Sequence, residues 1–142
     1  MTSKCIGYVD GSYDSVMKRY GVGVVMLSAK GELIDSFCVS GDNEMWASSH
    51  NITAELYATM KAIEWAFAHD YNIIEIRHDL AGTAKWANKL QAANKIPTQA
   101  FQLFIDKARQ RMDIYFTKVK AHSGDKWNEM ADGLAKKSLR GA

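Results

Sequence analysis

The sequence lacks the features of a membrane-spanning protein and of a secreted, cross-linked one. No stretch approaches the roughly 18 consecutive apolar residues that a membrane-spanning helix needs. The first residues, MTSKCIGYVDGS, do not contain the apolar core of a signal peptide. The only cysteines, Cys5 and Cys38, lie in predicted strands and fit neither a disulfide framework nor a zinc-ligand spacing. We therefore expect a cytoplasmic protein whose thiols are reduced and buried.

Acidic residues are scarce in the second half of the chain and basic residues in the first. Residues 1–79 hold six Lys and Arg against eleven Asp and Glu, whereas residues 80–142 hold twelve against five. This distribution indicates a polyanionic partner on one side and cation binding on the other, although charges clustered on solvated helices would give the same counts. The 142 residues contain 47% hydrophobic and 24% charged residues and no repeat or linker. We expect one domain over residues 1–142.

The apolar pattern divides the chain into strands and helices. Alternating apolar runs bounded by turn residues predict strands, and apolar residues every three or four positions predict helices. The predicted elements are a strand at 4–11, a hairpin at 19–41, a helix at 51–69, a strand at 72–79, helices at 80–95 and 98–112, a strand at 113–122 and a helix from Asp125. This order predicts an α/β fold with a mixed sheet and helices on both faces. In such sheets, sites form outside the carboxyl ends of the strands.

Asp10 and Asp79 close the first and fourth predicted strands. If these strands are parallel neighbours, both side chains lie at one edge of the sheet. Two carboxylates held close together raise each other's pKa unless a cation lies between them, so the pair predicts a divalent metal site. For either residue alone, a cap of the following turn or helix is the favoured explanation.

Glu55 and Asp132 are the two further candidates for this site. Glu55 lies in the first turn of a predicted helix, where an acid also suits the helix dipole, but no Lys or Arg follows it three, four or seven positions later. Asp132 borders the apolar stripe of the last helix, and the alternative for it is a surface ion pair with Lys136. Oxygen ligands without cysteine favour Mg²⁺ or Mn²⁺ over zinc. Two such ions about 4 Å apart can activate water for phosphodiester cleavage, so we predict a two-metal nuclease.

The sequence closely resembles the type 1 ribonuclease H family over nearly its whole length. The motifs that carry the resemblance are YVDGS, NITAELYA, HDLAG and VKAHSGDKWNEMADGLA. The resemblance implies a ribonuclease H-like fold, with a five-stranded sheet of three antiparallel strands followed by two parallel ones. It also implies cleavage of the RNA strand of RNA–DNA hybrids, leaving 5′-phosphate and 3′-hydroxyl ends. The implied cofactors are two Mg²⁺ ions, replaceable by Mn²⁺, with no organic cofactor, and a monomer is expected.

The resemblance assigns a role to each acid. Asp10 would bridge both ions, Asp132 would complete the ion that holds the attacking water, and Glu55 and Asp79 would complete the ion beside the leaving 3′-oxygen. His122 would assist proton transfer or product release, the alternative being an ordinary surface histidine.

The resemblance also implies substrate contacts. Gly11 and Ser12 would approach the RNA strand closely, and Asn51 would sense ribose 2′-hydroxyls, unless it is only a helix cap. Trp86 would lie along the DNA strand, the alternative being a core tryptophan. Phosphates would contact a set of lysines: Lys85, Lys89, Lys118 and Lys120.

The chain departs from some family members, and two other functions remain open. We expect neither the lysine-rich protrusion nor the amino-terminal hybrid-binding module of some relatives, and therefore weaker substrate binding. His78-Asp79-Leu80 stands where the family often has Thr-Asp-Ser. One alternative is a DNA nuclease of the same fold, of the resolvase or transposase type. The other is a noncatalytic nucleic-acid-binding module, which would be expected to have lost an acid.

Overall fold

The computed structural model describes residues 3–41, 51–79, 82–89, 93, 96–120 and 125–140. Its elements are β1 (Lys4–Asp14), β2 (Arg19–Ser28), β3 (Leu33–Gly41), α2 (Asn51–Ala68), β4 (Ile73–His78), α3 (Gly82–Ala87), α4 (Ile96–Ala108), β5 (Asp113–Lys118) and α5 (Lys126–Arg140). The strands form one sheet in the order β3-β2-β1-β4-β5. Strands β1 to β3 are antiparallel, and β4 and β5 run parallel to β1. The predicted five-stranded mixed sheet is confirmed.

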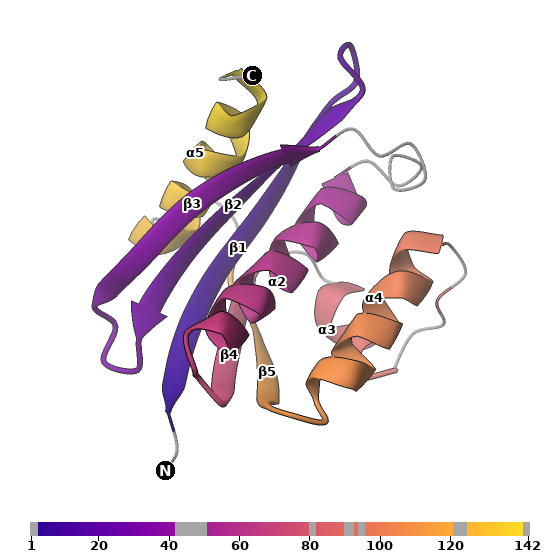
Figure 1. Cartoon of the computed structure of the whole chain (residues 1–142). Coiled ribbons are helices and arrows are strands. Elements are labelled where there is room, and N and C mark those ends of the chain that lie inside the picture. The colour runs from indigo at the N-terminus through magenta and orange to yellow at the C-terminus, as the bar shows by residue number, and fades with distance from the viewer. Residues whose placement is uncertain are drawn as a thin grey trace.

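Helices cover both faces of the sheet, as predicted. Helices α2, α3 and α4 lie on one face, and α5 lies on the other (Figure 1). Helix α2 packs on β1, β2 and β4, whereas α5 packs on β1, β2 and β3. Because β1 is in the middle of the sheet and contacts both α2 and α5, residues near its end can meet side chains from both faces.

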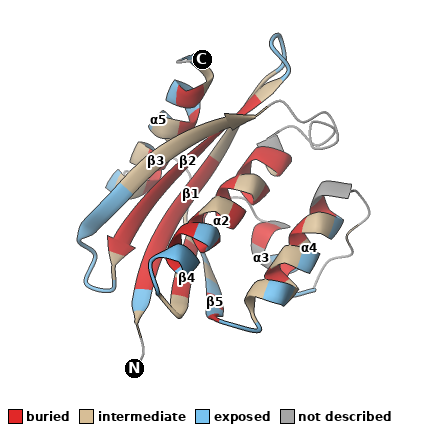
Figure 2. Cartoon of the chain, viewed as in Figure 1, coloured by how far each residue is buried: buried red, intermediate tan, exposed pale blue. Residues whose placement is uncertain are grey.

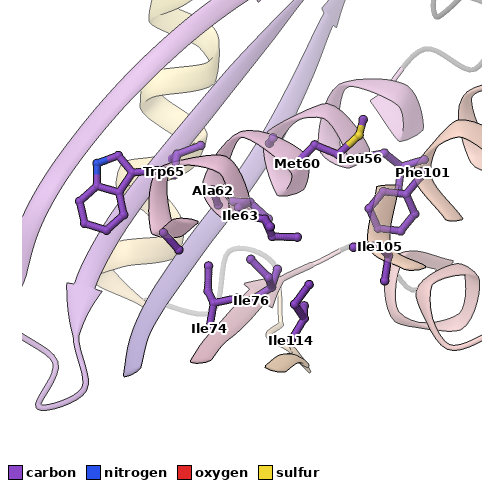
Figure 3. Packing of buried hydrophobic residues seen from close by; sticks show 14 of the residues in the cluster. Leu56, Met60, Ala62, Ile63, Trp65, Ile74, Ile76, Phe101, Ile105 and Ile114 are labelled. Carbon is purple, nitrogen blue, oxygen red and sulfur yellow. The ribbon is translucent and has the colours of Figure 1, made fainter. Parts of the chain in front are cut away.

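The larger apolar core lies between the sheet and α2, α3 and α4. Its residues come from the strands and the three helices and include several fully buried large side chains: Leu56, Ile63, Ile74, Ile76, Phe101 and Ile105 (Figure 3). Most of α2 is buried, as the red segments of Figure 2 show. Each large side chain contributes about 1.5–3 kcal/mol when it leaves water, so this core fixes α2 firmly on the sheet.

The core beneath α5 is smaller. Its buried residues are Ile6, Tyr8, Val25, Leu27 and Ala131. The predicted apolar stripe of α5 is confirmed, although only its alanines are buried and its larger side chains pack at the margin: Trp127, Met130 and Leu134. Alanine gives the helix a flat, shallow contact with the strands.

Several predicted element boundaries are wrong. Strand β1 continues to Asp14 because residues 10–14 pair with β2 after the pairing with β4 has ended. The helix predicted over 80–95 spans only Gly82–Ala87 in the part of that range that the structure describes, and Lys89 has a φ of 59°. Helix α4 begins at Ile96, so Pro97 stands in its first turn, where proline is well tolerated. Strand β5 ends at Lys118, earlier than expected.

Both cysteines are free, and Cys5 is buried as predicted, whereas Cys38 is half-buried. Burial raises the pKa of the Cys5 thiol to about 12, so this thiol stays protonated and unreactive at neutral pH. Among the described helices, none combines the length and apolar character required to cross a bilayer.

Candidate metal centre

The parallel pairing of β1 and β4 places Asp10 beside Asp79. The last residue pair of this ladder is Tyr8 with Arg77, and each acid lies two residues beyond it. The prediction that both acids share the carboxyl edge of neighbouring parallel strands is therefore confirmed. Asp10 does not close its strand, however, because β1 continues beyond it as the partner of β2.

Glu55 reaches the same place because α2 begins directly above Gly11. A Cβ atom on Gly11 would overlap the backbone of Ala54 and Glu55, so only glycine allows this close approach. The Glu55 side chain is 4% exposed, and its Oε1 accepts a hydrogen bond of 3.2 Å from the backbone N–H of Asp79. This bond joins the start of α2 to the end of β4.

Asp10, Glu55 and Asp79 each offer a carboxylate oxygen, and these oxygens all lie within 4.8 Å of one another. Asp10 and Glu55 are buried and Asp79 is half-buried. Asp10 is oriented by the backbone N–H of Gly11, which donates to its Oδ1 at 2.9 Å. Clustered, buried carboxylate oxygens are the ligand set of a hard divalent cation, so the three residues could hold a metal.

Asp132 approaches this group from the opposite face of the sheet. Gly23 is the β2 partner of Asp10, and a Cβ atom on Gly23 would overlap the backbone carbonyl of Ala131. The missing side chain lets α5 lie against β2, and the next residue, Asp132, shares a hydrogen bond with Asp10. Asp132 also accepts a hydrogen bond of 3.0 Å from Lys136. The surface ion pair considered from sequence is present, and it does not remove Asp132 from the acidic cluster.

The environment of Asp10 opposes its ionisation. Burial, the negative charge of Asp79 and the hydrogen bond and charge of Asp132 raise the pKa of Asp10 to about 8, although the N–H of Gly11 acts in the opposite direction. A carboxyl group that is costly to ionise becomes easy to ionise when a cation binds beside it. The electrostatics of the cluster therefore fit a cation site.

The other residues predicted to serve the site have different positions. His122 lies outside the described residues, as does the side chain of Asn51, whose backbone begins α2. Ser12 is half-buried in β1. Trp86 is 8% exposed and belongs to the core on the α2 face. The structure thus favours the alternative considered for Trp86, a core tryptophan.

The predicted phosphate-binding lysines are exposed, but they differ in surroundings. Lys118 pairs with His78 in the sheet and so lies next to the acidic edge, and Lys120 follows two residues later. Lys85 is an exposed residue of α3. Lys89 instead forms an ion pair of 3.1 Å with Asp106. Lys89 is therefore a weaker candidate for phosphate binding than the others.

The basic half of the sequence does not form one basic half of the molecule. Arg109 and Arg111 precede β5, at the end of the parallel strands opposite to the acids. Arg109 is used in packing, since its guanidinium donates to the carbonyls of Ala87 and Ile114 at 3.0 and 2.9 Å. Counting charges along the sequence could not predict this, because the basic residues that follow α4 lie at the end of the sheet opposite to the acids.

Sequence reasoning also missed residues that support the acids. Gly23 was not singled out, because only the packed structure shows that α5 touches the strand there. The hydrogen bond between Tyr8 and Asp125 joins residues 117 positions apart. The one signal was the position of Asp125 at the start of a predicted helix, where an aspartate is typical of a helix cap. Its Oδ1 does accept from the backbone nitrogens of Trp127 and Asn128 at 3.1 and 3.2 Å.

Comparison with known proteins identifies what the fold and site resemble. The RNase H family model matches residues 2–140. A ribonuclease H from Ruthia magnifica is 34% identical over 95 residues, which cover 60% of this chain and 65% of that protein, slightly less than two thirds. RNase H1 from the archaeon Halobacterium salinarum NRC-1 has the same fold, with a TM-score of 0.83 at 22% identity over 98% of this chain and 99% of that one. LC11-RNase H1, solved with an RNA/DNA hybrid, has a TM-score of 0.75 at 16% identity over 95% of this chain and 99% of that one.

Proposed function

This chain belongs to the RNase H family of nucleases, and we propose that it is an endoribonuclease that hydrolyses the RNA strand of RNA–DNA hybrids. The observation that carries the proposal is the meeting of four acids from four elements: Asp10, Glu55, Asp79 and Asp132. The hybrid bound to LC11-RNase H1, a protein of the same fold, supports this substrate.

The four acids would hold two Mg²⁺ ions, with Mn²⁺ as a substitute. The fit is supported by the carboxylate oxygens of Asp10, Glu55 and Asp79, which lie within 4.8 Å of one another, and by the raised pKa of Asp10. Asp10 is also the acid that Asp132 contacts. Asp10 would bridge the ions, Glu55 and Asp79 would complete one and Asp132 the other. When bound, the ions supply an activated water and stabilise the leaving oxygen. The products would carry 5′-phosphate and 3′-hydroxyl ends.

The protein groups around the acids would keep them in place during the reaction. The N–H of Asp79 holds the Glu55 carboxylate at 3.2 Å, and the N–H of Gly11 holds Asp10 at 2.9 Å. Both donors belong to the backbone, so the orientation of these two acids does not depend on a flexible side chain. His122 would move a proton or help the product leave.

Binding of the hybrid would depend mainly on its phosphates. Gly11, Ser12 and Asn51 would contact the RNA strand, and exposed Lys120 would contact phosphate together with Lys85 and Lys118. Such contacts are nonspecific for sequence and weaken as salt rises. We expect a monomer that works without an organic cofactor. A cytoplasmic location is supported by the free cysteines.

The direct test is incubation of the protein with an RNA–DNA hybrid, duplex DNA and duplex RNA of one sequence, each end-labelled, with and without Mg²⁺. The proposal expects cleavage of only the RNA strand of the hybrid, and only with Mg²⁺. Cleavage of duplex DNA at a similar rate would instead indicate a DNA nuclease of the resolvase or transposase type. Salt-sensitive binding without cleavage at any Mg²⁺ concentration would indicate a noncatalytic binding module.

A further inference from the structure

A chain of polar side chains lies on the α5 face of the sheet, just before the acids. The hydroxyl of Tyr8 donates to Oδ2 of Asp125 at 3.1 Å and accepts from Nη1 of Arg77 at 2.9 Å. Glu75 accepts from Nε of Arg77 at 2.8 Å and balances its charge. Tyr8 is 3% exposed, and both of these hydrogen bonds are partly buried, so they are less weakened by water than bonds on the open surface.

Tyr8 and Arg77 each stand one strand repeat before an acid of the candidate metal centre. Tyr8 and Arg77 form the last pair of the β1–β4 ladder, and Asp10 and Asp79 lie two residues further along. Two residues are one repeat of a strand. Asp125 caps α5, and Asp132 lies seven residues later, two turns along the same side of the helix. The polar chain and the acids are thus two adjacent layers built from the same elements.

The apolar contacts of α5 define its position along the sheet only weakly. The buried apolar residues of α5 are Ala131 and Ala135, and their backbone carbonyls lie over Gly23 and Gly21, which present no side chains. A flat contact between small residues allows a helix to shift or rotate with little loss of buried area. The bond from Tyr8 to Asp125 is directional and opposes such a shift at the first turn of α5.

We propose that Tyr8 is a positioning residue for the reaction, acting through Asp125 to hold α5 where Asp132 reaches Asp10. The inference rests on the proposed function, because it concerns the acid that would complete the second ion. Arg77 orients the Tyr8 hydroxyl toward Asp125. The hydroxyl contacts neither ion nor substrate in this scheme, and its role is to keep the fourth acid within reach.

The test uses Tyr8→Phe, which keeps the ring and removes the hydroxyl. Tyr115→Phe is the control for the loss of a tyrosine hydroxyl, because Tyr115 is 58% exposed on β5, which is not one of the strands that α5 packs on. For each protein, kcat and KM for the hybrid are measured across a Mg²⁺ series, and Mn²⁺ binding without substrate is measured by calorimetry. Tyr8→Phe should lower kcat about tenfold at limiting Mg²⁺, weaken Mn²⁺ binding several-fold and leave KM within about twofold. Tyr115→Phe should match the wild type.

A second variant distinguishes the Tyr8–Asp125 hydrogen bond from the helix cap that Asp125 also provides. Asp125→Ser keeps a capping oxygen but is too short to reach the Tyr8 hydroxyl. It should show the same shift in Mg²⁺ dependence, and it decides the question if Tyr8→Phe does not fold. If either variant folds and keeps the kcat and the metal binding of the wild type, the proposal is wrong, even if its melting temperature is lower. A change in KM alone would also overturn the proposal. Failure of the proposed function would look different, since the wild type itself would not cleave the hybrid.

Discussion

The helices on the two faces of the sheet are attached in different ways, and the candidate metal centre takes acids from both. Helix α2 is held by a large apolar core in which Leu56 and Ile63 are fully buried. Helix α5 has a smaller apolar core, to which it contributes buried alanines, Ala131 and Ala135, and is also tied by the polar bond between Tyr8 and Asp125. Apolar burial is strong and tolerant of small shifts, whereas hydrogen bonds are weaker but directional.

This difference separates the four acids into two groups. Asp10, Glu55 and Asp79 lie on β1, α2 and just after β4, which are joined by the large core, by the β1–β4 pairing and by the hydrogen bond from the Asp79 N–H to the Glu55 carboxylate. Asp132 lies on α5 and reaches Asp10 only if α5 keeps its place. We therefore expect the triad to persist under changes that displace Asp132, and the following variants are chosen to test this.

Asp10→Asn should have the largest effect on activity, because Asp10 lies beside Glu55 and Asp79 and also contacts Asp132. The change removes the charge that would bridge the ions and should lower kcat/KM for the hybrid by at least about 10³-fold, while circular dichroism stays that of the wild type. Asp113→Asn is the control, an exposed acid at the opposite end of the sheet, and should keep full activity. Substantial Mg²⁺-dependent cleavage by Asp10→Asn would refute the assignment of Asp10.

Gly11→Ala and Gly23→Ala test how firmly α2 and α5, respectively, are held on the sheet. In both, the new Cβ atom overlaps the backbone of a helix. Helix α2 cannot move without opening the large core, so Gly11→Ala should cost about 3 kcal/mol of unfolding free energy. Helix α5 can shift, so Gly23→Ala should cost only about 1 kcal/mol and yet lower kcat about tenfold.

Urea unfolding gives the stability of both variants, and cleavage of the hybrid gives their kcat. Gly133→Ala is a stability control on α5, because its Cβ atom would meet nothing within 4 Å, and it should stabilise the helix by about 0.5–1 kcal/mol. Equal losses of stability in Gly11→Ala and Gly23→Ala would argue against the contrast between the two faces.

The pH dependence of stability in metal-free buffer sharpens the account of Asp10. In the unfolded chain the Asp10 carboxyl ionises with its ordinary pKa of about 3.8, whereas in the folded protein it stays protonated up to a pKa of about 8. Between these values the unfolded state binds fewer protons, so this group makes stability fall as pH rises, by up to about 1.4 kcal/mol per pH unit. Urea midpoints at pH 5 and pH 8 should differ less in Asp10→Asn than in the wild type. Parallel profiles for the two proteins would contradict the raised pKa.

Lys136→Met should have the smallest effect. The Lys136–Asp132 pair spans 3.0 Å between side chains that are 52% and 27% exposed, and such pairs contribute about 0–1 kcal/mol. Activity should change less than about threefold, whereas Asp132→Asn should lower kcat more than about tenfold. If both variants lost activity equally, Asp132 would act through its surface ion pair and not through the acidic cluster.

Much of the fold, and the convergence of two of the acids, could be predicted from local sequence pattern. The helix at Asn51–Ala68 and the hairpin of β2 and β3 have clear periodicity and turn residues. The convergence of Asp10 and Asp79 follows from one assumption, that β1 and β4 are parallel neighbours, and the pairing confirms it.

The features that escaped prediction depend on contacts between distant segments. The end of β1 could not be read from apolar alternation, because residues beyond Asp10 are kept in the strand by pairing with β2. The role of Gly23 requires knowing that α5 crosses that strand, and the tie between Tyr8 and Asp125 requires the packed helix. The two alternatives for Trp86, a contact with the DNA strand and a core tryptophan, stayed open because the short helix α3 has no pattern long enough to show which side is buried.

The central claim is that the four acids form a binding site for divalent cations. Diffraction from crystals soaked in Mn²⁺, collected at a wavelength where manganese scatters anomalously, tests it most directly. The account predicts anomalous density in contact with the carboxylates of Asp10, Glu55 and Asp79, and a second peak between Asp10 and Asp132 when a hybrid is bound. Saturating Mn²⁺ without a peak at Asp10 would contradict it.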